Sequence, residues 1–120
     1  KVSNRMGIEG QRHCGIQMGL GYALCEGLKY DENGRNVYNN FRKYKMFTAD
    51  QMPSIQVDFI EAHEPNGPYG AKSIGEPATE VVGAAIANAI YNATGVAIDQ
   101  DPITPHVLFQ RFTEEGLIRD

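Results

Sequence analysis

A single acidic residue follows a glycine-rich loop in a way that suits proton-transfer chemistry. The loop GPYGAKSIG spans residues 67–75 and delivers Glu76 directly onto Pro77. Proline has its φ fixed near the helical value and lacks an N–H donor, so Pro77 fits the first position of a helix and leaves Glu76 at the N-cap. The helix dipole favours an ionised carboxylate there. Glu76 is therefore either a base aimed at whatever the loop encloses or a capping acid worth about 0.3–1 kcal/mol.

The other reactive side chains form no recognised catalytic or metal-binding pattern. The three histidines are isolated and neither cysteine has a partner at C-x-x-C spacing, which argues against a metal held by protein ligands. No serine lies in the G-x-S-x-G frame of a nucleophile elbow. Cys14 and Cys25 would lie about 16 Å apart on one helix, too far for a disulfide. The sequence therefore indicates a reduced, cytoplasmic chain.

A long helix is expected from Ala78 to Thr94, because Val82, Ile86 and Ala89 recur at helical spacing and Gly95 can end it. Its opposite face carries no charge, unlike the outer face of an ordinary surface helix. We expect both faces to contact protein. The uncharged run from 81 to 98 approaches the length of a membrane span, but its polar residues favour a buried helix instead.

A second long helix is expected over residues 11–28, although four glycines interrupt it. Each interior glycine costs about 0.5–1 kcal/mol of helix propensity relative to alanine. Gly15, Gly19 and Ala23 lie four apart and form a smooth stripe, against which a neighbouring helix or strand, or a flat cofactor, could pack closely. A dinucleotide-binding turn fits poorly, because the glycines do not reproduce G-x-G-x-x-G and no clear strand precedes them.

Composition limits the classes of fold and partner. A chain of 120 residues with 42% hydrophobic residues predicts one domain. Its formal charge of −4 and its Lys and Arg residues, which are scattered along the sequence, argue against nucleic acid and anionic membranes as partners.

A turn at 31–34 suggests a short hairpin, residues 55–60 alternate like a half-buried strand, and Thr104 with Pro105 opens a short helix to about Phe112. The predicted fold is α+β, with two long helices packed on a small mixed β-sheet.

Seven segments, in the same order, match those of a known family: IEGQ at 8–11, MGLGYAL at 18–24, DENGR at 31–35, NFRKYKMFTADQMP at 40–53, GPYGAKSIGEP at 67–77, AAIANAIYNATG at 84–95 and ITP at 103–105. With these segments the chain resembles the molybdenum hydroxylases, the xanthine dehydrogenase and aldehyde oxidase family. The resemblance covers nearly the whole chain but only the C-terminal part of the family's molybdopterin-binding subunit. It implies that residues 1–120 form a single C-terminal segment of a larger molybdenum cofactor-binding domain.

The resemblance also implies roles for particular residues. Glu76 matches the family's catalytic glutamate, which takes a proton from the molybdenum hydroxyl as its oxygen attacks an electron-poor carbon. Gln11 matches a glutamine that contacts the pterin, and an amide can donate and accept there at once. The loop around the cofactor would consist of Gly70, Ala71, Lys72, Ser73, Ile74 and Gly75. Lys72 is equally well explained as a solvated surface lysine, and no protein side chain is expected to ligate the metal.

The chain departs from the family at three positions. Met18 stands where a second glutamine is usual, and a thioether cannot donate a hydrogen bond, so one cofactor contact is in question. Arg5 replaces a proline, and Ser73 replaces a smaller residue beside the active loop.

The implied function is oxidative hydroxylation of an N-heterocycle or an aldehyde, with an N-heterocycle favoured. The implied cofactor is molybdopterin, which in bacteria often has the cytosine dinucleotide form, with molybdenum. Iron–sulfur clusters and FAD would reside on other domains or subunits, and these, with the remainder of the molybdenum subunit and a small-molecule substrate, are the expected partners. The segment alone is expected to be inactive. The alternative is a non-catalytic scaffold or assembly module that retains the family fold.

Overall fold

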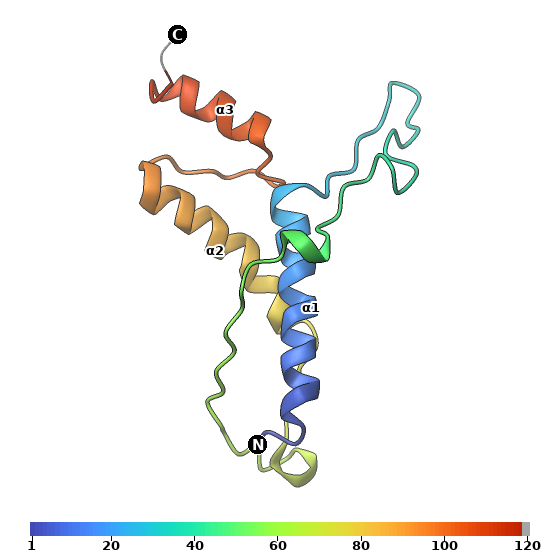
Figure 1. Ribbon diagram of the computed structural model, residues 1–120, viewed down its shortest axis with the longest axis vertical. Coiled ribbons are helices and arrows are strands. Elements are labelled where there is room, and N and C mark those ends of the chain that lie inside the picture. The colour runs from blue at the N-terminus through green and yellow to red at the C-terminus, as the bar shows by residue number, and fades with distance from the viewer. Residues whose placement is uncertain (119–120) are drawn as a thin grey trace.

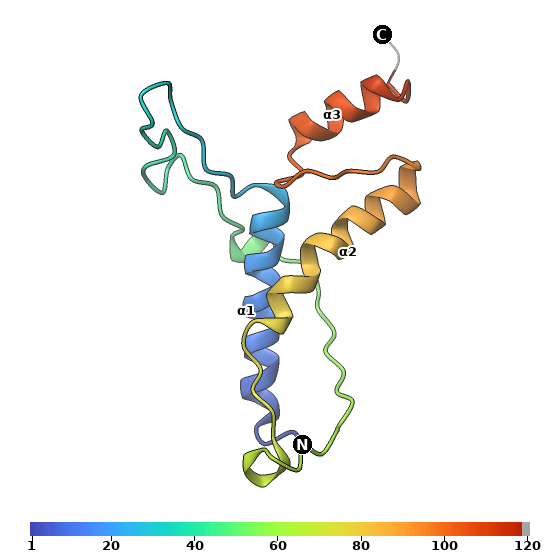
Figure 2. The same cartoon turned by 180° about the vertical axis from the view of Figure 1, so that it is seen from behind.

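The computed structural model describes residues 1–118, and these contain three α-helices (Figure 1). They are α1 (Arg5–Leu24), α2 (Pro77–Thr94) and α3 (Pro105–Glu114), with short 3₁₀ turns η1 (Ala49–Gln51) and η2 (Pro68–Gly70). No helix in this part of the chain is both long and apolar enough to cross a membrane. Figure 2 shows the first part of α2 crossing α1 near the middle of α1, after which α2 diverges from α1 toward α3.

The glycine stripe of α1 is a helix-packing surface. A Cβ atom added to Gly15 would lie 2.5 Å from the Cβ of Ala78, and one added to Gly19 would lie 2.6 Å from the Cβ of Val82. Gly15 and Gly19 are therefore required because the backbone of α1 lies directly against the first turns of α2. Close packing of a neighbouring helix is confirmed as the reason for this stripe.

The small core lies along this contact and at the end of α1. Its buried apolar residues are Ala23, Ala78, Val82, Val96 and Ile103. The backbone N–H of Ile103 donates to the carbonyl of Ala23 at 2.6 Å, which ties the segment after α2 to the last turn of α1. This contact brings the start of α3 to the C-terminal end of α1.

The predicted β-sheet is wrong, because residues 1–118 contain no β-strand. The expected hairpin is reduced to a single bridge between Tyr30 and Asn36. Residues 55–60 do alternate between half-buried and exposed, as predicted, and they run back alongside α1 (Figure 1). However, no backbone hydrogen bond joins residues 54–61 to another segment of the described chain. Alternation predicts an extended segment with one covered face, but a sheet also requires a paired neighbour.

The helix predictions hold in part. Helix α2 begins at Pro77 and ends at Thr94, before Gly95, whose φ is 76°, as predicted. Helix α1 begins six residues earlier than expected, at Arg5, because the side chain of Asn4 caps it by accepting from the N–H of Gly7. Helix α2 was expected to be covered on both faces, yet only Ala78 and Val82 are buried along it. The chain has a radius of gyration of 18.3 Å, well above the value of about 14 Å for a compact domain of this length.

Candidate functional site

The loop before α2 closes on itself through its glycines. The N–H of Gly70 donates to the carbonyl of Gly67 at 3.0 Å, and the N–H of Glu64 donates to the carbonyl of Gly70 at 3.2 Å. Gly70 is buried with a φ of 76°, and a Cβ atom there would overlap the imidazole of His63. Only glycine satisfies both conditions, because other residues rarely adopt this φ and all of them carry a Cβ. This turn returns the chain toward α1 just before Glu76.

The residues after this turn border a hollow of about 240 Å³. Lys72, Ser73 and Ile74 line one side of it together with Pro77, and α1 supplies Ile8 and Arg12 among others on the facing side. Lys72 and Ser73 are exposed, whereas Ala71, Ile74 and Gly75 are half-buried. A Cβ atom at Gly75 would meet no heavy atom within 4 Å, so open space adjoins its backbone. The loop thus presents Lys72, Ser73 and Ile74 to a concave surface.

Glu76 occupies the N-cap of α2, as the sequence predicts. Its carbonyl accepts from the N–H of Thr79 at 2.8 Å and continues the helix, but its side chain makes no capping hydrogen bond. The side chain is exposed beside the hollow and is not among the residues that line it. The carboxylate is therefore not used for capping, although its charge still lies at the positive end of the helix dipole.

Gln11 lies on the same stripe of α1 as Gly15 and Gly19. Because residues four apart share a face, Gln11 lies about 6 Å along the helix axis before the contact between Gly15 and Ala78. Glu76 precedes Ala78 by two residues, so both candidates lie at the same end of the α1–α2 crossing. Both side chains are exposed, and Arg12 rather than Gln11 lines the hollow.

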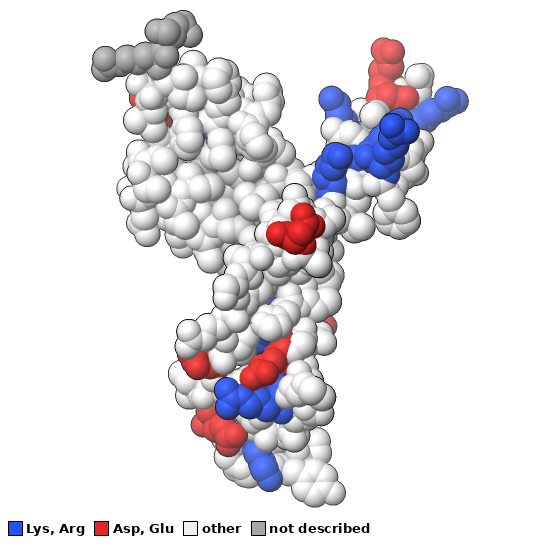
Figure 3. Space-filling view, in the orientation of Figure 1, with Lys and Arg blue, Asp and Glu red and all other residues white. Residues whose placement is uncertain are grey.

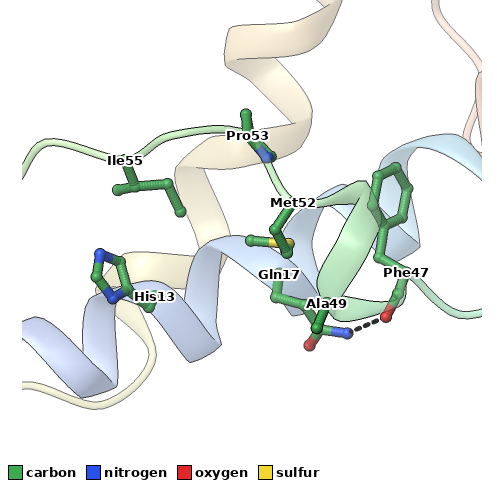
Figure 4. Close-up of a pocket in the computed structure, with 7 residues that line it drawn as sticks. All are labelled: His13, Gln17, Phe47, Ala49, Met52, Pro53 and Ile55. Carbon is green, nitrogen blue, oxygen red and sulfur yellow. Dashed lines mark hydrogen bonds between the residues drawn. The ribbon is translucent and has the colours of Figure 1, made fainter.

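A separate hollow of about 500 Å³ lies on the other side of α1 (Figure 4). It is lined by His13, Gln17, Phe47, Ala49, Met52, Pro53 and Ile55. Gln17 Nε2 donates to the carbonyl of Phe47 at 2.9 Å, which holds the returning segment against α1. By helical spacing, His13 and Gln17 lie opposite Gly15, so this hollow faces away from Glu76. The sequence alone does not predict this hollow, because the hollow depends on residues 47–55 returning to α1.

Similarity to known proteins covers almost the whole chain. A family model described as "Molybdopterin cofactor-binding domain" matches residues 1–53. The putative xanthine dehydrogenase molybdenum-binding subunit XdhA of Escherichia coli (strain K12) is 44% identical over 118 residues, which are 98% of this chain and 16% of that protein. The 6-hydroxypseudooxynicotine dehydrogenase complex subunit gamma of Paenarthrobacter nicotinovorans is 37% identical over 114 residues, 92% of this chain and 14% of that protein.

A solved structure shares the same arrangement of elements. Quinoline 2-oxidoreductase from Pseudomonas putida 86 superimposes with a TM-score of 0.85 and 32% identity, over 92% of this chain and 14% of that chain. The chain therefore spans about one-sixth or less of the length of the proteins it matches.

Proposed function

The chain belongs to the molybdenum hydroxylase family of xanthine dehydrogenases and aldehyde oxidases, as the C-terminal part of the molybdopterin-binding subunit, and we propose that in the complete enzyme Glu76 is the general base of an oxidative hydroxylation. The observation that carries the proposal is the position of Glu76. Glu76 lies at the head of α2, in the chain between Ile74 and Pro77, which both line the hollow, and its side chain is not used to cap the helix.

The residues beside the hollow fit a phosphate-bearing pterin cofactor. Gly70 is held in a conformation that suits glycine, open space adjoins Gly75, and Lys72 with Ser73 borders the concave surface. Small residues let backbone N–H groups approach oxygen atoms of a ligand closely. Residues 70–75 would hold the molybdopterin together with Gln11, whose amide can donate and accept on the pterin edge. When bound, this cofactor supplies the redox chemistry of the hydroxylation.

Two influences act on the charge of Glu76. The dipole at the start of α2 favours the charged carboxylate, whereas covering by the rest of the subunit would disfavour it. Opposing influences suit a group that must be charged before the reaction and must then accept a proton. The exposed carboxylate of this segment becomes a desolvated base only within the complete subunit, so we infer that the segment alone is inactive.

The names of the relatives support a proposed class of substrate and proposed partner subunits. They include xanthine dehydrogenase subunits and a quinoline oxidoreductase, whose names refer to N-heterocycles. We therefore propose an N-heterocycle as the substrate class, with an aldehyde as the alternative. The relatives from Escherichia coli and Paenarthrobacter nicotinovorans are described as subunits, which supports partner subunits in a complex. Iron–sulfur clusters and FAD on those partners are proposed on the resemblance alone. The cytosine dinucleotide form of the cofactor is proposed on the resemblance alone.

Cofactor content tests this function. The complete enzyme should contain molybdenum and fluorescent pterin in equal amounts. Gln11→Ala should lower both, because it removes a donor and an acceptor from the pterin edge. Gln100→Ala, at another exposed glutamine, should leave both unchanged. A complete enzyme that folds but contains neither molybdenum nor pterin would contradict the proposal and favour the scaffold alternative.

A further inference from the structure

The head of α2 rests on α1 at a close backbone contact. A Cβ atom added to Gly15 would lie 2.5 Å from the Cβ of Ala78, 3.2 Å from the carbonyl carbon of Ala78 and 3.2 Å from Thr79 Oγ1. Gly15 is buried, and Ala78 is only 2% exposed. Neither atom of Ala78 can rotate aside, so relief of the overlap would require a shift of the backbone. The absence of a side chain at Gly15 therefore sets how closely the two helices approach.

Glu76 moves with this contact, because it is joined to the first turn of α2. Its carbonyl accepts from the N–H of Thr79 at 2.8 Å and from the N–H of Glu80 at 3.3 Å. Thr79 is also one of the residues that face Gly15. On the other side of Glu76, no backbone hydrogen bond joins residues 72–75 to another part of the chain that the structure describes. The position of Glu76 is therefore set by α2 and not by the loop.

Packing alone holds α2 against α1. Within residues 1–118, no ion pair and no backbone hydrogen bond joins the two helices. Figure 3 shows many of the Lys and Arg side chains on residues 29–45, which project beyond the end of α1 and away from this contact. Carbon atoms that are not bonded to each other pack best at about 3.5–4.0 Å. A methyl group at Gly15 should therefore move the head of α2 outward by about 1 Å, with no polar bond to resist the movement.

We propose that Gly15 is a positioning residue for the proton transfer, because its contact with Ala78 sets where Glu76 stands relative to the cofactor. This inference rests on the proposed function, which assigns the general base to Glu76 and a pterin contact to Gln11. Gln11 precedes Gly15 by four residues, about 6 Å along α1. Glu76 precedes Ala78 by two residues, about 3 Å along α2. The two groups are therefore carried by short lengths of helix that meet at this contact.

Proton transfer is sensitive to such spacing. A catalytic group must lie within hydrogen-bond reach of the proton that it accepts, and a displacement of about 1 Å can lower a rate by about 100-fold. In the complete enzyme, Gly15→Ala should therefore lower turnover per bound molybdenum by about 100-fold. A crystal structure of this variant should show the head of α2 displaced from α1 by about 1 Å. An undisplaced helix, or normal turnover with a displaced helix, would overturn the proposal.

A double-mutant cycle separates positioning from a general loss of stability. The complete enzyme is prepared with Gly15→Ala, with Glu76→Gln and with both, and turnover is again expressed per bound molybdenum. Gly15→Ala should cost less than about threefold in the Glu76→Gln enzyme, because the carboxylate that it displaces is already absent. A similar fold loss in both backgrounds would refute the positioning role, since Gly15 would then not act through Glu76.

Moving the methyl group across the contact provides the matched control. Ala78→Gly only removes atoms, and it should lower turnover by about tenfold because the head of α2 loses its stop on α1. Gly15→Ala combined with Ala78→Gly leaves only the two contacts at 3.2 Å and should recover at least about tenfold of the turnover that Gly15→Ala loses. No recovery, with the head of α2 back in place in the crystal structure, would overturn the proposal.

The same variants distinguish this inference from the proposed function. Normal turnover in a cofactor-loaded Glu76→Gln enzyme would refute the general base and the positioning role together. Loss of turnover in Glu76→Gln, with normal turnover in both Gly15→Ala and Ala78→Gly, would overturn the positioning role and leave the general base standing.

Discussion

Carboxylates in this chain divide into those that hold local structure and those that do not. Glu26 accepts from the hydroxyl of Tyr44, Asp31 accepts from two backbone N–H groups, and Asp50 accepts from the hydroxyl of Thr48, which lowers the pKa of Asp50. Glu76 makes no side-chain hydrogen bond within the described residues. Replacing Glu76 should therefore leave the fold intact, which makes a loss of activity interpretable.

The pair of Tyr44 and Glu26 gives a pH-dependent prediction. The hydrogen bond to Glu26 raises the pKa of Tyr44 from 10.0 to about 12, because it stabilises the neutral phenol. The pair therefore adds stability that is fully present below pH 10 and is lost as the pH rises through about 12. Glu26→Ala should return the Tyr44 pKa toward 10, measured by NMR titration of labelled tyrosine rings. Glu32→Gln, at an exposed carboxylate that makes no hydrogen bond to Tyr44, should leave the Tyr44 pKa high. An unchanged Tyr44 pKa in Glu26→Ala would contradict the assignment.

At the scale of elements, the sequence predicts those helix boundaries that single residues set through their own backbone conformation. Pro77 and Gly95 bound α2 as expected, since both act on their own backbone. The apolar periodicity predicts the start of α1 six residues too late, because it weakens around Gly7 and Gly10, whereas Asn4 is the cap that marks the actual start. The position of Glu76 at the N-cap was predictable for the same local reason. The absence of a β-sheet was not predictable, because the alternation of apolar and polar residues cannot reveal whether a neighbouring strand exists.

The packing of α1 on α2 predicts opposite effects at two glycines of one helix. Gly19→Ala should destabilise the chain by about 1–3 kcal/mol, because the new methyl group would press into Val82 and separate the helices. Gly10→Ala should stabilise it by about 0.5–1 kcal/mol, because nothing lies within 4 Å and alanine favours the helix. Urea unfolding followed by circular dichroism measures both changes. Equal stabilisation by the two substitutions would refute this packing.

At the scale of the whole molecule, the elongated shape separates two surfaces. The hollow beside Glu76 adjoins the first half of α1, and residues 29–45 project from beyond the end of α1 (Figure 1). Much of α2 is exposed, including Val81 at 62% and Tyr91 at 52%. The sequence predicted protein contact on both faces of this helix, and residues 1–118 supply it only at the first turns. The covering of a surface by other parts of a longer protein cannot be derived from a segment that spans about one-sixth of its relatives.

The central claim is that Glu76 is the catalytic base, and the most direct test compares Glu76→Gln with Glu80→Gln in the complete enzyme. Both are exposed carboxylates at the start of α2, so both substitutions change the charge at this helix end equally. We predict that Glu76→Gln lowers turnover by about 100-fold or more with normal molybdenum and pterin content, because an amide cannot accept the proton. Glu80→Gln should retain turnover and cofactor. A cofactor-loaded Glu76→Gln enzyme with turnover close to that of the unsubstituted enzyme would contradict the account.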